Sequence, residues 1–186
     1  TIGPKDAARA ALGLPQAPLL LFGAVGGAAD PRKGGDLLAD ALHKLHALGH
    51  QPGLAVFGGP APKGLPAPAI ELGAITDEAR LARAYQAADV FVSPSRQDNF
   101  PSTVIEAQAC GTAAVAFDIG GMPDAVGDIA RLAPPFDTEA LAAIIAHTLT
   151  APPDPGRIRA ETLALVAPDI VAAQHVALYE RLLASG

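Results

Sequence analysis

The sequence predicts an α/β domain built on a Rossmann-like parallel sheet with helices on both faces. Short apolar runs bounded by glycine or polar residues recur along the chain, a pattern typical of strands buried on both faces. Segments with a helical spacing of apolar residues alternate with these runs, an order that favours βαβ units. The chain has 186 residues, half of them apolar, which fits one domain with a packed core.

The expected elements follow in order. Residues 1–16 form a lead-in whose short helix ends at Gly13 and Pro15. A glycine-rich loop follows the first strand, and the four prolines of residues 59–68 predict a loop after the second. The expected strands are 19–23, 54–58, 70–73, 89–93, 113–117 and 130–133, and the expected helices are 5–12, 36–48, 77–88, one from about 102, 138–149, 157–166 and 170–183. The last helix occupies most of residues 168–186, and we expect one domain over residues 1–186.

Composition excludes several classes of protein. The net charge of −6 and the pI of about 5.2 argue against a general nucleic-acid binder. We expect no membrane span, because no apolar run approaches the required length, and no signal-peptide pattern opens the sequence. The single cysteine, Cys110, cannot form an internal disulfide, so we expect a small packed side chain and a reducing, cytoplasmic setting.

The most informative stretch is residues 94–111, which follows the strand at 89–93. It reads as a polar loop and then a helix, with Ser102 or Thr103 able to cap the helix and Glu106 about one turn inside it. Asp98 lies in the loop. Ligands of open parallel sheets collect at the carboxyl ends of strands, where helix N-termini direct free N–H groups outward. Backbone amides for a phosphate and carboxylates for hydroxyl groups together describe a site for a sugar nucleotide.

This stretch resembles a known family. The run Asp98-Asn-Phe-Pro-Ser-Thr-Val-Ile-Glu106-Ala-Gln-Ala-Cys-Gly-Thr, followed by Val115-Ala-Phe-Asp-Ile-Gly-Gly-Met-Pro-Asp124, is similar to the nucleotide-sugar half of retaining GT-B glycosyltransferases of family 4. That family has an acidic residue, seven intervening residues and then a glutamate. The resemblance covers nearly the whole chain and implies the C-terminal half of a GT-B fold, with the N-terminal acceptor-binding domain absent from this sequence.

The resemblance implies roles for three residues. Glu106 corresponds to the glutamate that binds the ribose hydroxyls, and Asp98 to the acidic residue that contacts the transferred sugar. Most members have Glu at the position of Asp98, so the contact here is shorter or different. Lys33 corresponds to the lysine on the donor diphosphate, where a fixed cation stabilises the charge that develops as the leaving group departs.

Other positions carry weaker expectations. The family often has an arginine where this chain has Ala24, and Arg32 could supply a second positive charge or point to solvent. Gly120 and Gly121 let backbone amides approach an anion, or form a simple tight turn. Ser102 and Thr103 offer backbone N–H groups to phosphate while their hydroxyls cap the helix. On the resemblance alone, residues 73–75 line the base pocket.

Two other kinds of site do not fit. The glycine-rich loop lacks the Gly-Lys-Ser/Thr ending of a Walker A motif, because Gly34 follows Lys33. His43, His46 and His50 could share a helix face, but they lack supporting carboxylates, and the resemblance implies that no metal or other cofactor is required.

The sequence therefore predicts the donor-binding domain of a retaining hexosyltransferase that moves a sugar from a nucleotide diphosphate to a glycan or lipid-linked acceptor. The expected partners are the nucleotide sugar and the missing domain, without nucleic acid. We expect the isolated domain to be inactive and the full enzyme to be cytoplasmic, reaching the inner face of a membrane only through the absent domain. The alternatives are a nucleotide-sugar epimerase or phosphorylase on the same fold, or a non-catalytic nucleotide-binding module.

Overall fold

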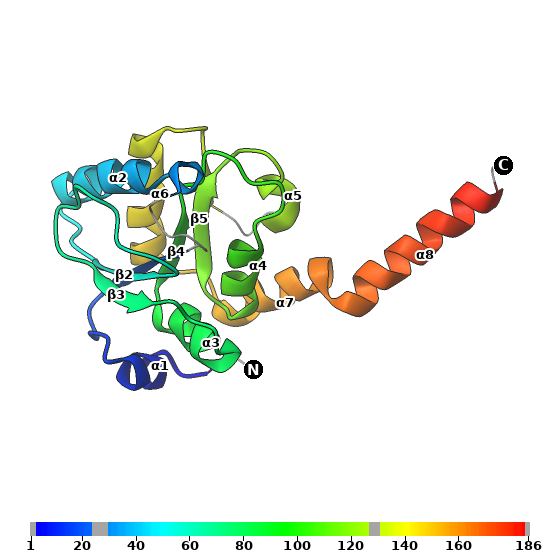
Figure 1. The fold of residues 1–186 in the computed structure, drawn as a ribbon, viewed down its shortest axis with the longest axis horizontal. Helices are drawn as coiled ribbons and strands as arrows, with labels where there is room; N and C mark the ends of the chain where they lie inside the picture. Colours follow the sequence, from blue (N-terminus) through cyan, green and yellow to red (C-terminus); the bar gives the residue numbers. More distant parts are fainter. Residues whose placement is uncertain (1–2, 24–29, 127–130, 185–186) are drawn as a thin grey trace.

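A six-stranded parallel sheet forms the centre of the described structure (Figure 1). The structure is a computed structural model that describes residues 3–23, 30–126 and 131–184. The sheet has the order β3-β2-β1-β4-β5-β6, with every neighbouring pair parallel. The strands are β1 (Leu19–Gly23), β2 (Gly53–Phe57), β3 (Ile70–Gly73), β4 (Val90–Ser93), β5 (Ala113–Phe117) and β6 (Arg131–Ala133).

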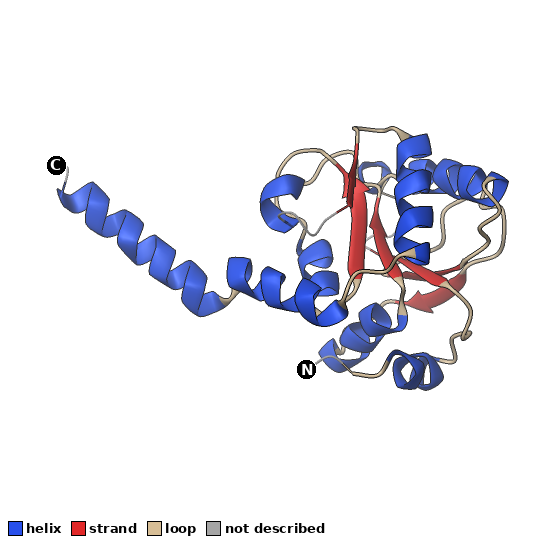
Figure 2. Ribbon diagram, turned by 180° about the vertical axis from the view of Figure 1, so that it is seen from behind, coloured by secondary structure: helices blue, strands red, loops and turns tan. Residues whose placement is uncertain are grey.

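Helices cover both faces of this sheet, as the sequence predicts (Figure 2). They are α1 (Lys5–Leu12), α2 (Gly35–Ala47), α3 (Glu78–Ala87), α4 (Ser102–Ala109), α5 (Met122–Val126), α6 (Thr138–Thr150), α7 (Pro155–Val166) and α8 (Pro168–Ala184), with a short 3₁₀ helix, η2 (Pro31–Lys33). Side chains of α2 and α6 pack in the core on one face, and side chains of α1, α3, α4 and α5 pack on the other.

Each buried strand supplies both cores because its side chains alternate between the two faces. In β1, Leu20 and Phe22 lie in the core with α2 and α6, whereas Leu19 and Leu21 lie in the core with α3 and α4. This explains why β1 reads as a continuous apolar run rather than an alternating one.

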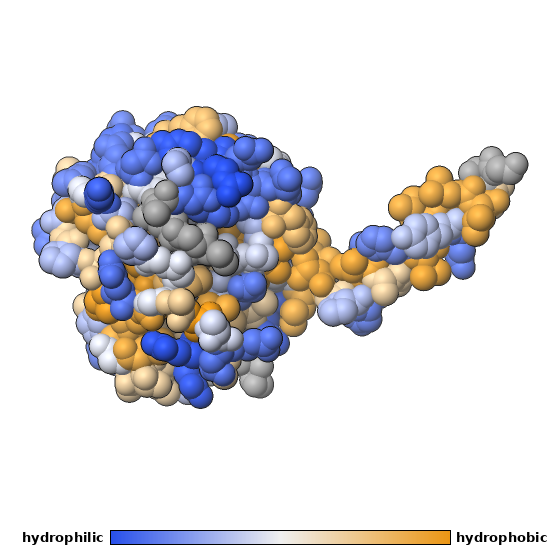
Figure 3. Space-filling view, viewed as in Figure 1, coloured by the Kyte–Doolittle hydropathy of each residue, from blue (hydrophilic) through white to orange (hydrophobic). Residues whose placement is uncertain are grey.

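The C-terminal helix α8 projects away from the rest of the domain (Figures 1 and 2). It has no buried residue, and apolar side chains cover much of its visible surface (Figure 3). The combined stretch Pro155–Ala184 meets the length and composition of a membrane span. Only 6% of its most apolar window is buried inside the domain. The expectation that no segment approaches a span is therefore wrong by this criterion, because α7 and α8 follow each other with almost no polar break. Length and composition alone are weak evidence here, since α7 packs Ile158 and Thr162 against the domain.

Candidate functional site

Three loops meet at the carboxyl edge of the sheet. They follow β1, β4 and β5, and they comprise residues 30–34, 94–101 and 118–121. The strand order reverses between β1 and β4, and this point of an open parallel sheet is where ligands usually bind. Arg96 N donates to Arg32 O over 2.7 Å, and Gly121 N donates to Asp98 O over 3.1 Å. The loop after β4 is thereby joined to the loops on both of its sides.

Glycines allow these loops to approach so closely. Gly34 has φ of 68°, and a Cβ there would overlap the carbonyl oxygen of Pro94. A Cβ at Gly120 or Gly121 would overlap the carbonyl oxygens of Asp98 and Asn99 respectively. The three glycines therefore hold the loop that carries Asp98 against its two neighbours.

Lys33 and Asp98 form an ion pair between two of these loops. Lys33 Nζ lies 3.2 Å from Asp98 Oδ2, and the two side chains are 26% and 16% exposed. The residues are 65 positions apart in the sequence but flank the point where the strand order reverses. They line an open cavity of about 380 Å³ together with Arg32, Gln97, Asn99 and Phe100. The structure thus brings together the two residues predicted to contact diphosphate and sugar.

Arg32 lines the same cavity, but its positive charge is already paired with Asp30. Its side chain is 73% exposed, and its Nε and Nη2 atoms donate to the Asp30 carboxylate, the latter over 2.7 Å. Asp30 also begins η2 by accepting from Arg32 N. These hydrogen bonds and the nearby positive charge hold the pKa of Asp30 below its ordinary value. Arg32 is therefore directed back onto its own turn.

Helix α4 begins without a side-chain cap. Pro101 occupies the N-cap position, and Ser102 is the first helical residue. The prediction that the hydroxyl of Ser102 or Thr103 caps this helix is wrong, because both residues lie inside the first turn, from which a hydroxyl does not serve as the N-cap acceptor. Backbone bonding starts with Val104 N and Ile105 N, which donate to Pro101 O. The N–H groups of Ser102 and Thr103 therefore remain at the open end of the helix dipole.

Glu106 lies one turn further along α4, in a separate cavity from the Lys33–Asp98 pair. Its Oε2 accepts a hydrogen bond from the Tyr85 hydroxyl of α3 over 2.9 Å. This cavity of about 440 Å³ lies between α3, α4 and α7 and is lined by Glu78, Leu81, Ala82, Tyr85, Glu106, Ala109, Cys110 and Arg159.

Cys110 lines the same cavity and is half-buried. Burial raises the pKa of its thiol above the ordinary value, which agrees with the expected small packed side chain.

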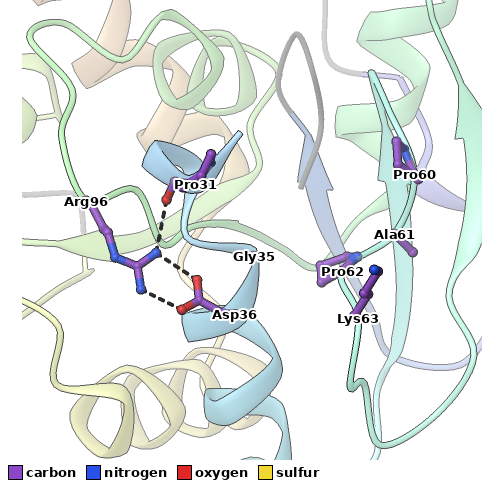
Figure 4. Close-up of a pocket in the computed structure, with 8 residues that line it drawn as sticks. All are labelled: Pro31, Gly35, Asp36, Pro60, Ala61, Pro62, Lys63 and Arg96. Atoms are coloured by element: carbon purple, nitrogen blue, oxygen red, sulfur yellow. Dashed lines mark hydrogen bonds and ion pairs between the residues drawn. The ribbon is translucent and has the colours of Figure 1, made fainter. Parts of the chain in front are cut away.

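A third cavity lies on the other side of η2 (Figure 4). It measures about 490 Å³ and is lined by Pro31, Gly35, Asp36, Pro60, Ala61, Pro62, Lys63 and Arg96. Arg96 donates to both carboxylate oxygens of Asp36 over 2.7 and 2.6 Å and to the carbonyl of Pro31. Asp36 thus forms a bidentate ion pair with the Arg96 guanidinium. The hydrogen bonds from Arg96 lower the pKa of the Asp36 carboxyl group. The cavity is larger than its neighbour, but the charge of Arg96 is already paired with that of Asp36.

Some sequence predictions fall outside these contacts. Ala24 and the glycines at 26 and 27 lie outside the described residues. Gly73 is the last residue of β3, with φ of 69°, and residues 74–75 follow it. His43 Nε2 lies 2.8 Å from the carbonyl oxygen of Gly64. In residues 3–23, 30–126 and 131–184, no group of three or more potential metal ligands comes together.

Sequence reasoning missed the contribution of Tyr85 to this region. The helical spacing of residues 77–88 predicts that the Tyr85 ring points inward, but it does not identify a partner for the hydroxyl. The available signal was chemical: a buried tyrosine needs a hydrogen-bond acceptor, and Glu106 was the acidic residue on the next helix.

Comparisons with known proteins agree with this architecture. A family model described as "Glycosyl transferases group 1" matches residues 20–151. A D-inositol 3-phosphate glycosyltransferase of Saccharomonospora viridis is 39% identical over 173 residues, which covers 81% of this chain and 39% of that protein. The corresponding enzyme of Mycolicibacterium smegmatis is 39% identical over 145 residues, which covers 69% of this chain and 31% of that protein.

Solved structures give the same result. Sucrose-phosphate synthase of Thermosynechococcus elongatus superimposes with a TM-score of 0.74 and 32% identity over 98% of this chain and 50% of that one. HepE of Anabaena, solved with UDP and glucose, superimposes with a TM-score of 0.75 over 95% of this chain and 51% of that one, and its 20% identity supports the fold alone. The chain thus spans 31–39% of the length of the two relatives and about half of the two solved structures.

Proposed function

The chain belongs to the group 1 glycosyl transferases, and on this premise we propose that it binds the nucleotide-diphospho-sugar donor of a retaining glycosyltransferase. In this proposal the donor lies along the carboxyl edge of the sheet, with its sugar and diphosphate at the loops after β1 and β4. Its ribose lies beside α4.

The ion pair between Lys33 and Asp98 is the observation that carries the proposal. It places one cation and one carboxylate 3.2 Å apart in an open cavity at the point where the strand order reverses. A diphosphate carries more negative charge than one carboxylate, so it competes with Asp98 for the Lys33 ammonium group. Asp98 is then free to accept from sugar hydroxyls, while Lys33 stabilises the charge that develops on the leaving diphosphate.

The start of α4 joins this cavity to Glu106. The open N–H groups of Ser102 and Thr103 suit a phosphate at the helix N-terminus. Glu106 lies four residues beyond Ser102 on the same helix face, at a helical rise of about 6 Å. A phosphate and a ribose are adjacent groups of a nucleotide, so this short spacing suits consecutive parts of one ligand.

The matched relatives limit what is proposed about the whole reaction. They are named for sugar transfer, and this chain spans less than two fifths of their length. We therefore assign acceptor recognition to the part of those enzymes that the chain does not match, and keep the acceptor at the level of a hydroxyl group. By the same reasoning the 186-residue chain binds donor without transferring it, since we assign the acceptor side of the cleft and its closure to the unmatched part of those enzymes. We place the full enzyme in the cytoplasm.

Calorimetric titration of the chain with UDP, GDP and ADP tests the donor site. We expect one diphosphate to bind best, and Lys33→Ala to weaken it at least about tenfold, which is about 1.4 kcal/mol. The matched control is Lys63→Ala, because Lys63 lines the neighbouring cavity beside Pro62. The free nucleosides provide a second control, since losing the Lys33 charge should leave their weaker binding unchanged.

Two results would contradict the proposal. One is equal loss of affinity in the Lys33 and Lys63 variants, which would indicate a general charge effect. The other is the absence of binding by all three nucleotides at millimolar concentration in a folded chain.

A further inference from the structure

The Tyr85 ring is fixed in the core between α3 and the sheet. Its side chain is 1% exposed and makes edge-on contacts with Phe57 and Phe91, with ring centroids 5.6 and 5.5 Å away. Ring packing of this kind leaves a buried tyrosine little freedom to turn. The direction of its hydroxyl is therefore set by the core.

The Tyr85 hydroxyl donates a hydrogen bond to Glu106, an exposed residue of α4. Burial, together with the Glu106 charge, raises the pKa of Tyr85 far above its ordinary value, so the phenol keeps its proton. A protonated phenol beside a carboxylate donates its hydrogen bond in one direction only, here to Oε2 over 2.9 Å.

This contact restrains a side chain that would otherwise be mobile. An exposed glutamate samples many rotamers, and fixing it when a ligand binds costs side-chain entropy. The bond from Tyr85 fixes Glu106 before any ligand arrives. It occupies one acceptor position of Oε2 and leaves Oε1 for another donor, because a carboxylate can accept several hydrogen bonds.

We propose that Tyr85 is a positioning residue which holds the Glu106 carboxylate for the hydroxyl groups of the donor ribose. Through this hydrogen bond, Tyr85 strengthens the preference of the domain for ribose over 2′-deoxyribose nucleotides. The inference rests on the proposed function, because it takes Glu106 as the ribose ligand.

The test separates this role from a purely structural one. Tyr85→Phe keeps the ring and its contacts with Phe57 and Phe91 but removes the hydroxyl. The 186-residue chain is titrated with UDP, GDP and ADP and with their 2′-deoxy counterparts. Wild type should prefer ribose by about tenfold, the value of one charge-assisted hydrogen bond. In Tyr85→Phe, ribonucleotide affinity should fall roughly three- to tenfold while 2′-deoxynucleotide affinity changes less than about twofold.

Two further variants make the result specific. Tyr179→Phe is the matched control, because Tyr179 lies exposed on α8, and it should bind both kinds of nucleotide like wild type. Glu106→Ala should abolish the ribose preference by itself. Tyr85→Phe added to Glu106→Ala should then change the preference no further, because the tyrosine acts only through the carboxylate.

Each remaining outcome overturns a defined part of the argument. If Tyr85→Phe weakens ribo- and deoxyribonucleotides equally, or weakens neither, Tyr85 has no positioning role although the donor site stands. If wild type binds nucleotides but Glu106→Ala keeps the ribose preference, Glu106 is not the ribose ligand and the inference falls. If wild type binds none of the six nucleotides, the proposed function falls as well.

Discussion

At the scale of single residues, one glycine determines how the loop after β1 meets the loop after β4. Gly34 combines a left-handed backbone with a position directly against the carbonyl of Pro94. Any side chain there must move one of the two loops, and Lys33 immediately precedes it. The position of the Lys33 ammonium group therefore depends on the absence of a neighbouring Cβ.

Replacing Gly34 with alanine tests this dependence. Gly13→Ala is the control, because Gly13 has nearly the same φ, 65°, with nothing within 4 Å of an added Cβ. The control should lose about 1–2 kcal/mol of unfolding free energy from the left-handed backbone alone. Gly34→Ala should lose more in urea unfolding and should also weaken nucleotide binding. Equal losses in the two variants would show that the contact with Pro94 is unimportant.

A second group of residue-scale contacts, centred on Asp89, joins helix α1 to strand β1 of the sheet. Asp89 accepts from Arg9 Nη2 and Leu19 N, both over 2.7 Å, and from Lys5 Nζ. Burial alone would raise the pKa of Asp89, but the hydrogen bonds from Lys5 and Leu19 and the charges of Lys5 and Arg9 outweigh burial. The pKa therefore lies below its ordinary value.

This lowered pKa predicts a pH-dependent stability. Asp89→Asn should lose about 2–3 kcal/mol of unfolding free energy at pH 7, because it leaves the buried Arg9 guanidinium without its carboxylate. A depressed folded pKa contributes stability above the unfolded pKa of about 3.9 and loses it as the pH falls through the folded value. The difference between wild type and variant should thus shrink below about pH 4. A difference that stays constant from pH 7 to pH 3 would contradict this account.

At the scale of elements, the sequence predicts the strands and longer helices well. Their observed bounds lie within two residues of the expected ones, because apolar runs and helical spacing are local signals. The helix α5 and the 3₁₀ helix η2 were not predicted, since neither is long enough to show a period. The η2 turn depends on the Asp30 side chain, which accepts a hydrogen bond from Arg32 N. The glycine-rich sequence around Asp30 predicts only a loop.

The cap of α4 shows a different kind of error. Ser102 is a common capping residue, but Pro101 takes the N-cap position and its side chain has no acceptor. The helix start is thus left open where a phosphate is proposed to bind. Propensity predicted the usual stabilised end, whereas the chain has an unsatisfied one, which is typical of functional sites.

Alanine substitutions distinguish these two kinds of helix start. Ser102→Ala should change the unfolding free energy by less than about 0.5 kcal/mol, because its hydroxyl caps nothing. Asp77→Ala is the comparison, since the Asp77 carboxylate accepts from Arg80 N at the start of α3 over 2.7 Å. It should cost about 1 kcal/mol in chemical unfolding. A loss of that size in Ser102→Ala would restore the serine as a cap.

At the scale of the whole molecule, α8 stands apart from the domain. It has no buried residue, and it exposes Val176, Tyr179, Leu182 and Leu183 by more than half. Because α8 buries none of its residues, it adds little buried apolar surface to the core of this domain.

Truncation at Ala167 tests whether the domain depends on α8. Without α8 the unfolding free energy in urea should stay within about 0.5 kcal/mol of the full chain, because no buried contact is lost. Ending the chain at Thr150 instead also removes α7, whose Ile158 and Thr162 are buried, and should destabilise the domain by several kilocalories per mole. A large loss from the first truncation would show that α8 folds back onto the domain.

The sequence also predicts the general position of the site. Lys33 and Asp98 each follow a predicted strand, so their meeting at the carboxyl edge is expected from topology, whereas Glu106 lies in a separate cavity between α3, α4 and α7. Their partners could not be predicted, because Lys33–Asp98 and Tyr85–Glu106 are contacts between distant segments whose geometry depends on the folded loops.

The most direct test of the central claim is a structure of this chain with its best-binding nucleoside diphosphate. We expect the diphosphate within hydrogen-bonding distance of Lys33 Nζ and of the backbone N–H groups of Ser102 and Thr103, with the ribose hydroxyls at Glu106. A nucleotide in the cavity formed by Pro60–Lys63 and Arg96, away from Lys33, would contradict the account.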